Sequence, residues 1–218
     1  DTPEFRNWFG DSKVVDADGK PLVVYRGEGS GENFTVFDRR MTREKAFFFT
    51  PDLDIANTYA KKNNWSMTGL QEPRAFYLKA EKLFDPRSKE GRAFIREWAK
   101  NWDEWVDRQS GDDIDPVDAV LEGRLFDYEG DWSAERWRDL QASIEAAGYD
   151  GARLPDWDND RGTFDAIIAF RPEQVKSAIG NSGKFDPNDP NILNQSRSPE
   201  TESLIAARKR VAVLEKLL

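Results

Sequence analysis

Apolar runs of strand length occur near both ends of the 218-residue chain, and a stretch with helical spacing separates them. The strand-like runs are residues 22–25, 46–50, 75–79, 151–154 and 164–170. Between them, the stretch from Ser88 to Ala147 holds two groups of large apolar side chains that recur every three or four residues, as on one face of a helix. One group lies between residues 94 and 105 and the other between residues 137 and 147. The pattern therefore predicts strands on both sides of a mostly helical segment.

Turn and capping residues predict where several of these elements begin and end. The turn residues Asp16–Gly19 predict a hairpin between the apolar residues on either side of them. Asp52 is expected to cap a helix that follows the run at 46–50, and Ser133 is expected to cap a later helix. The acidic segment 111–130 indicates a turn-rich region, and the acidic segment 156–162 indicates a polar loop that leads into the last strand.

The chain contains neither histidine nor cysteine. This composition excludes disulfides, His-based acid–base catalysis, Ser-His-Asp triads and ordinary zinc sites. Any chemistry must come from carboxylates, Arg or Lys, hydroxyls, aromatic rings or backbone groups. The formal net charge of −9 argues against general binding to duplex DNA, which usually needs a basic surface. No run approaches the roughly 18 apolar residues of a membrane helix, so no membrane partner is expected.

The last residues form a separate unit in this interpretation. Residues 196–218 follow a loop rich in Asn, Asp, Pro and Gly, and they carry an apolar stripe at helical spacing. We expect a domain at 1–195, with a helical insert at about 88–147. A connector helix at 196–218 is expected to lead to further domains of a longer polypeptide.

Three ordered segments carry a resemblance to a known family. They are Val23–Glu28, Ala46–Tyr59 and Thr163–Lys176. Together they resemble ADP-ribosyltransferases, which split NAD and pass its ADP-ribose to an acceptor. The resemblance implies an α+β fold, with a split, mostly antiparallel β core, surrounding helices and a helical insertion. It places NAD, as substrate, in the cleft between the sheets. No metal is implied, because the nicotinamide of NAD is already a cationic leaving group.

The first segment resembles the family's first core strand, which ends in a His-Gly or Arg-Gly pair; here the pair is Arg26-Gly27, as in the arginine-led branch. The resemblance implies that Arg26 contacts the phosphates or the adenosine ribose of NAD. It also implies that the backbone at Gly27 approaches the nicotinamide amide, with Tyr25 and Glu28 as flanking candidates for cofactor binding. An arginine provides hydrogen-bond donors for phosphate, and glycine permits close approach. The alternative is that Arg26 is a surface side chain in a turn.

The second segment resembles the aromatic strand of the family and the helix that follows it. In poly(ADP-ribose)-polymerase-like members two aromatic rings sandwich the nicotinamide, and the resemblance assigns this role to Phe48 and Tyr59. Thr50 stands in for the Ser or Thr of the arginine-led branch, and Phe49 is a further candidate for cofactor binding. The alternative is that both aromatic side chains belong to the core, as we expect for the rings of Phe47 and Phe49.

The third segment resembles the last core strand, but its expected acid is missing. Counting back from Gln174, the position of the catalytic glutamate holds Ala166. The family's acid binds the ribose 2′-hydroxyl and stabilises the oxocarbenium-like charge. We expect that alanine replaces that glutamate in an engineered, inactive variant. The alternative is a natural alanine, either with Asp165 as the acid or without transferase activity. Asp165 would need a bulge, because successive strand residues face opposite ways.

A closer resemblance covers about 190 residues of the chain. The matching pieces are Trp8–Val15, Gly148–Gly151, Val175–Asn181 and Phe185–Ile192. They are similar to the ADP-ribosyltransferase domains of phage and mobile-element polyvalent proteins. This resemblance implies an effector that enters the bacterial host cytoplasm with the element's DNA and modifies a host macromolecule. The acidic charge favours a protein side chain over nucleic acid as acceptor. A catalytically silent NAD- or partner-binding module and an NAD glycohydrolase are the alternatives.

Overall fold

The computed structural model describes most of the predicted domain. The described residues are 2–27, 34–42, 44–62, 72–102, 113–125, 131–158, 160–179, 181, 183 and 185–193. Glu28 and the predicted connector helix at 196–218 lie outside them. Helices and mostly antiparallel sheets combine in the described part, so the α+β class is confirmed.

Two β-sheets form the centre of the fold. The three-stranded antiparallel sheet has the order β1-β3-β7, with β1 at Val24–Arg26, β3 at Arg74–Leu78 and β7 at Val175–Ser177. The four-stranded sheet has the order β2-β6-β5-β4, with β2 at Phe47–Phe49, β6 at Gly162–Ala169, β5 at Gly151–Asp158 and β4 at Leu83–Phe84. The β4–β5 pair is parallel, and all other pairs are antiparallel.

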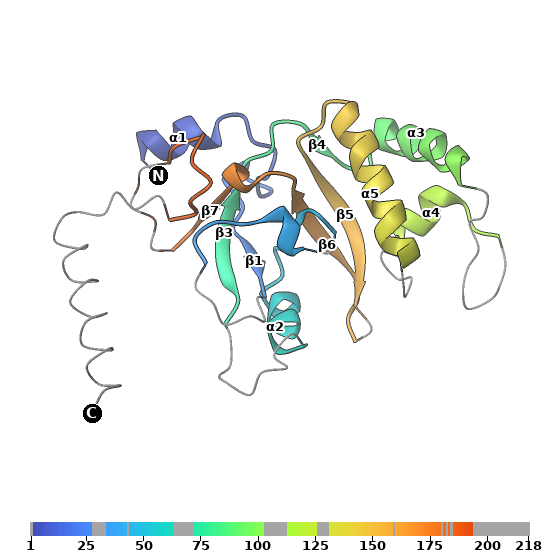
Figure 1. Cartoon of the computed structure of the whole chain (residues 1–218), viewed down its shortest axis with the longest axis horizontal. Helices are drawn as coiled ribbons and strands as arrows, with labels where there is room; N and C mark the ends of the chain where they lie inside the picture. Colours follow the sequence, from blue (N-terminus) through green and yellow to red (C-terminus); the bar gives the residue numbers. More distant parts are fainter. Residues whose placement is uncertain are drawn as a thin grey trace.

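The four-stranded sheet is covered on both faces. Figure 1 shows the three-stranded sheet on one side of it and helices α3, α4 and α5 on the other. Because successive strand residues face opposite ways, Phe47 and Phe49 enter the core between the two sheets, whereas Phe48 packs toward the helices. Along β6, Ile167 and Ala169 face the other sheet, and Ile168 faces the helices. The position of a residue along β2 or β6 therefore decides whether its side chain packs against the three-stranded sheet or against the helices.

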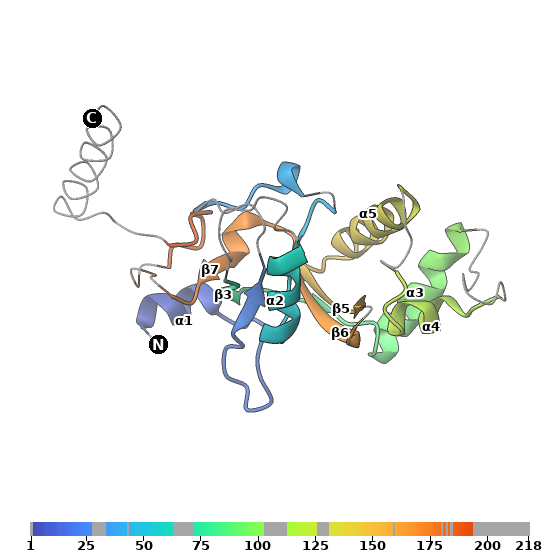
Figure 2. The ribbon, with the colours of Figure 1, turned by 90° about the horizontal axis from the view of Figure 1, so that it is seen from below.

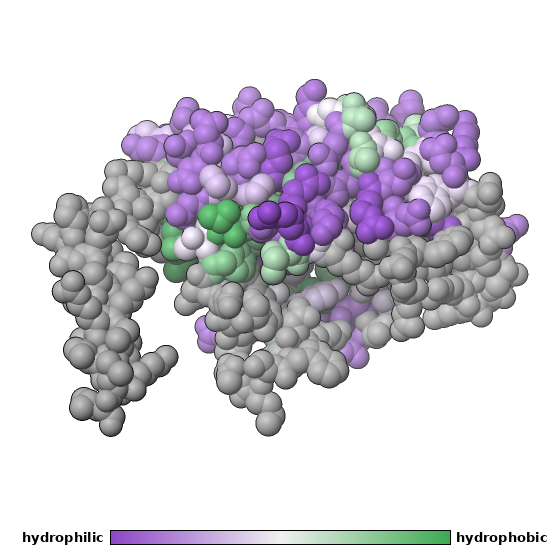
Figure 3. Space-filling model, in the orientation of Figure 1, coloured by the Kyte–Doolittle hydropathy of each residue, from purple (hydrophilic) through white to green (hydrophobic). Residues whose placement is uncertain are grey.

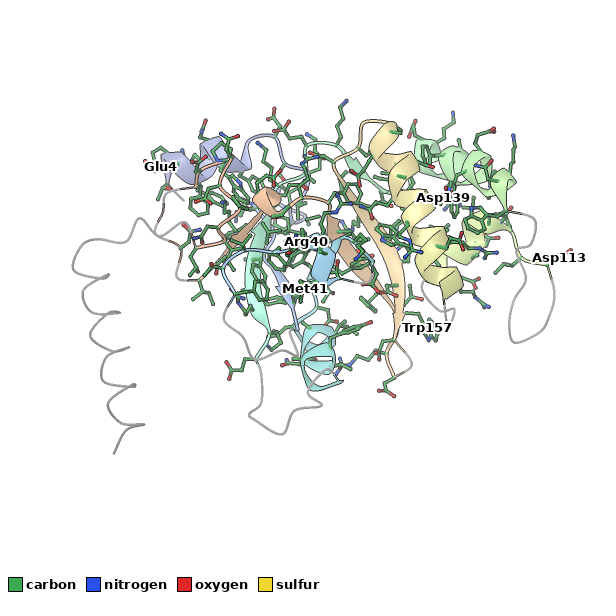
Figure 4. The ribbon with its side chains drawn as sticks, viewed as in Figure 1. Glu4, Arg40, Met41, Asp113, Asp139 and Trp157 are labelled. Atoms are coloured by element: carbon green, nitrogen blue, oxygen red, sulfur yellow. The ribbon has the colours of Figure 1, made fainter. Side chains whose placement is uncertain are left out.

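The helices of the insert are α3 (Lys89–Trp98), α4 (Pro116–Leu121) and α5 (Asp131–Ala146), with a 3₁₀ turn η2 at Ala99–Asn101. Asp139, labelled in Figure 4, lies on α5 where it faces α3. Its Oδ2 accepts hydrogen bonds from the indole N–H groups of Trp98, at 2.7 Å, and Trp102, at 3.4 Å. The helical character expected for residues 88–147 is therefore present in the described part of that stretch.

Two predictions within the insert were wrong. The acidic segment 111–130 contains α4, because the side chain of Asp115 accepts hydrogen bonds from the N–H groups of Val117 and Asp118 and so caps a helix that begins with proline. Helix α5 begins at Asp131, so Ser133 lies inside the helix and is not its cap.

The remaining helices lie outside the insert. They are α1 at Pro3–Phe9, α2 at Leu53–Lys62, and the 3₁₀ turns η1 at Arg39–Met41 and η3 at Pro172–Gln174. The predicted cap of α2 is confirmed, because Asp52 Oδ1 accepts hydrogen bonds from the N–H groups of Asp54 and Ile55 at 2.8 and 3.1 Å. In Figures 1 and 2, α2 lies at one end of both sheets, between β1 and the β5–β6 hairpin.

Two turn predictions need correction. The hairpin around Asp16–Gly19 forms, but only as an isolated bridge between Val15 and Pro21, and sheet pairing begins at Val24. The predicted polar loop at 156–162 is mostly strand, because β5 continues to Asp158 and β6 starts at Gly162. The positive φ of Gly162, 76°, suits a tight hairpin of this kind.

The face seen in Figure 3 is mostly hydrophilic, and apolar colour is confined to small areas of it. The large aromatic side chains are instead among the most buried in the described part of the chain, Trp8, Trp137, Phe47 and Phe76 among them. None of the described helices is long and apolar enough to cross a bilayer.

The side chain of Gln174, a residue that follows β6, links the backbone next to the ends of β3, β5 and β6. Its side-chain oxygen accepts hydrogen bonds from the N–H groups of Phe170, at 3.1 Å, and Arg171, at 2.8 Å. Its side-chain nitrogen donates to the carbonyls of Lys79, at 2.8 Å, and Asp150, at 2.7 Å. The side chain is 3% exposed. One amide therefore satisfies four backbone groups that follow β3, precede β5 and follow β6.

We predict that Gln174→Ala lowers the free energy of unfolding by about 3 kcal/mol, because several buried backbone groups lose their partners. Urea unfolding followed by circular dichroism measures the change. Glu173→Ala is the matched control: Glu173 pairs with Arg171 at 3.4 Å in a partly exposed position, so its loss should cost less than about 1 kcal/mol. Equal losses in the two variants would contradict the role given to Gln174.

Candidate functional site

A cavity of about 440 Å³ lies where the ends of both sheets meet α2. Its wall is made by the end of β1, the loop before β2, β2 itself, α2 and the β5–β6 hairpin. The lining residues are Tyr25, Arg26, Gly27, Glu44, Ala46, Phe48, Phe49, Thr50, Ile55, Ala56, Tyr59, Asp156, Trp157, Phe164 and Ala166. The volume lies within the range of about 300–1,000 Å³ that is usual for small-molecule sites.

Candidate residues from all three sequence segments line this one cavity. They are Tyr25, Arg26, Gly27, Phe48, Phe49, Thr50, Tyr59 and Ala166. Asp165 does not line it, and Glu28 lies outside the described residues. The fold thus brings together positions from β1, β2, α2 and β6 that are far apart in the chain.

A backbone pair between Tyr25 and Thr50 joins the two sheets at the cavity. The N–H of Tyr25 donates to the carbonyl of Thr50 at 2.7 Å, and the N–H of Thr50 donates back to Tyr25 at 2.9 Å. The hydroxyl of Thr50 accepts a hydrogen bond from the N–H of Asp52 at 3.1 Å, at the turn into α2. This pair fixes the ends of β1 and β2 relative to each other.

The guanidinium of Arg26 is held on the cavity wall. Its Nη1 donates to the carbonyl of Phe48 at 2.8 Å. Its Cζ lies 5.8 Å from the ring centre of Phe37 and 5.9 Å from that of Phe49, within the range of cation–π attraction. The half-buried side chain is therefore oriented by β2 before any ligand arrives.

Gly27 is needed for packing as well as for any ligand contact. A Cβ at this position would lie 2.2 Å from the carbonyl oxygen of Ala56 and 2.4 Å from the backbone nitrogen of Ala60, both on α2. No side chain fits in that space. The absence of a side chain at Gly27 therefore lets β1 and α2 touch, in addition to the ligand approach predicted from the sequence.

Phe48 and Tyr59 reach the cavity from different elements, β2 and α2. The ring of Phe48 packs edge-on against Trp137, with 5.4 Å between ring centres, and the ring of Tyr59 packs edge-on against Phe164 at 6.3 Å. Burial raises the pKa of the Tyr59 hydroxyl, and the carboxylates of Asp156, Asp158 and Glu44 raise it further. The hydroxyl therefore stays protonated and able to donate.

Ala166 and Asp165 lie on opposite faces of β6. Ala166 is 2% exposed and faces the cavity, in regular register with Leu154. The Asp165 carboxylate accepts hydrogen bonds from Nε and Nη2 of Arg153 at 2.8 and 2.5 Å, and it also pairs with Arg87. No bulge interrupts the β5–β6 ladder between Gly151 and Asp158. Asp165 is thus held by two arginines away from the cavity.

Three chemically notable lining residues were missed by sequence reasoning: Glu44, Asp156 and Trp157. The sequence predicts a polar loop at 156–162, whereas β5 continues to Asp158 and its alternation puts Asp156 on the same face as Leu154. Trp157 lies near the end of β5 (Figure 4) and is 44% exposed. Within the described ranges, no three acidic side chains gather as a set of metal ligands.

A family model described as "ADP-Ribosyltransferase in polyvalent proteins" matches residues 16–185. The chain belongs to this family. The match includes all of the cavity-lining residues, from Tyr25 to Ala166. Neither curated proteins nor solved structures gave a match. The chain therefore carries an ADP-ribosyltransferase domain, while the limits predicted for it, 1–195, stay a prediction.

The raised pKa of Tyr59 predicts a pH dependence of stability. The folded state keeps this hydroxyl neutral at pH values where an unfolded tyrosine, with a pKa of about 10, ionises. Its contribution is therefore complete below about pH 10 and is lost as the pH rises toward the raised pKa. Urea unfolding at about pH 8 and pH 11 should show a larger loss for the parent than for Tyr59→Phe. Equal losses would contradict the prediction.

Proposed function

We propose that the domain binds NAD in the cavity and transfers its ADP-ribose to a macromolecule of a bacterial host. The observation that carries this proposal is the convergence of three family-like segments on one cavity. The family supports the transferase chemistry, and the cavity supports the position of the dinucleotide. NAD serves as substrate, and the proposal needs no metal.

The lining residues suggest how NAD would lie. Arg26, oriented by the Phe48 carbonyl, would contact the phosphates or the adenosine ribose through its guanidinium. The rings of Phe48 and Tyr59 would flank the nicotinamide. The backbone of Gly27 would approach the carboxamide, with Tyr25, Phe49 and Thr50 completing that end of the site.

The reaction requires negative charge near the ribose carbon that loses nicotinamide. As the glycosidic bond breaks, its electron pair leaves with nicotinamide and the ribose becomes oxocarbenium-like. A carboxylate at position 166 would face this charge, because Ala166 lies on the cavity wall. In this proposal Ala166 replaces a glutamate, and the chain as it stands has lost most of its rate.

The acceptor follows from charge and from the family. We propose a host protein side chain, because a chain with a net charge of −9 has little general attraction for nucleic acid. The family name supports a place among further domains of a polyvalent protein, and delivery with phage or mobile-element DNA is part of the proposal. Ala166 also favours a second candidate, an NAD-binding module without transferase activity.

Ala166→Glu decides between these two candidates. We predict that it raises ADP-ribose transfer by a factor on the order of 10² or more, the scale of one preorganised charge-stabilising group. Labelled NAD is incubated with the variant and host lysate, and protease or nuclease digestion then identifies the class of acceptor. Ala166→Gln, which adds a side chain of similar size without charge, should bring no rise. No rise with glutamate would favour the silent module.

Arg26→Lys should weaken NAD binding by about tenfold, because lysine lacks the planar fork that serves a carbonyl and a phosphate together. Isothermal titration calorimetry gives the affinity. Arg74→Lys is the matched control: Arg74 pairs with Arg26 across β1 and β3 and lies over the rings of Phe34 and Phe76, but it does not line the cavity. An equal loss in both variants would show a structural effect.

A further inference from the structure

Asp156 lies beside Ala166 on the same face of the four-stranded sheet. In the β5–β6 ladder Leu154 pairs with Ala166, and Asp156 pairs with Phe164. Asp156 and Ala166 are therefore diagonal neighbours, about 7–8 Å apart in a sheet of this kind. Both line the cavity. A carboxylate from Asp156 thus reaches the space that a glutamate at position 166 would also reach.

The backbone of Asp156 is held firmly by the helical insert. Gly123, with a φ of 78°, packs so closely on it that a Cβ at Gly123 would lie 2.8 Å from the carbonyl carbon of Asp156. The Oδ1 atom of Asp156 accepts a hydrogen bond from the N–H of Trp157 at 2.7 Å. A group that stabilises charge in a reaction works best when it is held in place before the reaction begins. The half-buried carboxylate of Asp156, on a strand that packs against the insert, fulfils this condition.

The charge of Asp156 acts on the part of the cavity assigned to nicotinamide. Among the carboxylates that raise the pKa of the Tyr59 hydroxyl, Asp156 has the largest effect, ahead of Asp158 and Glu44. Tyr59 is one of the two rings proposed to flank nicotinamide. In the position proposed for NAD, the carboxylate of Asp156 would therefore lie near the nicotinamide.

The other candidate carboxylates are less well placed. Asp165 is on the opposite face of β6, paired with Arg153 and Arg87. Glu44 lines the cavity, but it precedes β2 on a loop, where its carbonyl accepts a hydrogen bond from the Trp137 indole at 2.8 Å. Asp156 alone among these three combines the cavity, a strand position and the face of Ala166.

We propose that Asp156 is the carboxylate that stabilises the ribosyl cation in the chain as it stands, where position 166 has none. The inference rests on the proposed function. With water as acceptor, the C1′–N bond breaks and its electron pair leaves with nicotinamide. The water oxygen forms the new C1′–O bond, and one proton passes to the solvent. The carboxylate of Asp156 stays ionised throughout and faces the positive charge on the ribose.

Release of nicotinamide from NAD tests the proposal without knowledge of the acceptor. The parent should release nicotinamide above the rate without enzyme, and Asp156→Asn should lower that rate by about tenfold or more. Asp156→Glu, which keeps the charge, should retain more activity than Asp156→Asn. Asp165→Asn removes the carboxylate on the opposite face of β6, which pairs with Arg153 and Arg87 and does not line the cavity, and should change the rate by less than about threefold. Thermal unfolding of each variant shows that the fold is intact.

A double variant separates catalysis from structure. If both carboxylates face the same ribose, Ala166→Glu should keep its rate within about threefold when Asp156→Asn is added, because glutamate then supplies the charge. A parent without nicotinamide release, an unchanged rate in Asp156→Asn, or a rate in the double variant as low as in Asp156→Asn would each overturn the inference. Calorimetry distinguishes failure of this inference from failure of the proposed function. If NAD still binds when one of these results is found, only the role of Asp156 is refuted. If NAD binds neither the parent nor the variants, the proposed NAD site is refuted as well.

Discussion

A β-sheet buried on both faces is the constraint from which the rest of this structure follows. Because side chains alternate along β2 and β6, each strand supplies one core with its even positions and another with its odd positions. Phe47 and Phe49 meet the three-stranded sheet, and Phe48 meets the helical insert. A shift of one residue would exchange the two cores and would also turn Ala166 away from the cavity.

Two ties hold the sheets at opposite ends of β2 and β6. Where β6 ends, the amide of Gln174 satisfies four backbone groups. At the other end, the backbone pair of Tyr25 and Thr50 joins β1 to β2. Gly27 lets α2 come against that junction. The cavity lies at this second end. Its shape therefore depends on the contact between β1 and β2, on the contact of α2 with β1, and on the absence of a side chain at Gly27.

The chemistry of the cavity is set by where its charges lie. Arg26 is oriented by a carbonyl and two rings, and the cavity-lining carboxylates come from the β5–β6 hairpin and the loop before β2. Asp165, the other candidate for the role of the missing glutamate, lies on the opposite face of β6, where it pairs with Arg87 and Arg153. Family membership establishes the type of domain. The positions of the charges in the cavity bear on the proposed rate of ADP-ribose transfer and on the proposed acceptor.

The sequence by itself determined most of the strands, the helical character of the insert, the absence of histidine and cysteine chemistry, and the three segments that carry the family resemblance. Those properties are local: apolar spacing, turn residues and short motifs can be read along the chain. Only the tertiary structure decided that Asp165 pairs with Arg153 and that Asp156 lies beside Ala166, because both facts depend on the register between two strands. The helix at Pro116–Leu121 was missed because its polar residues resemble a turn until Asp115 is seen as its cap. The role of Gly27 was likewise hidden, since only the packed fold shows α2 against it.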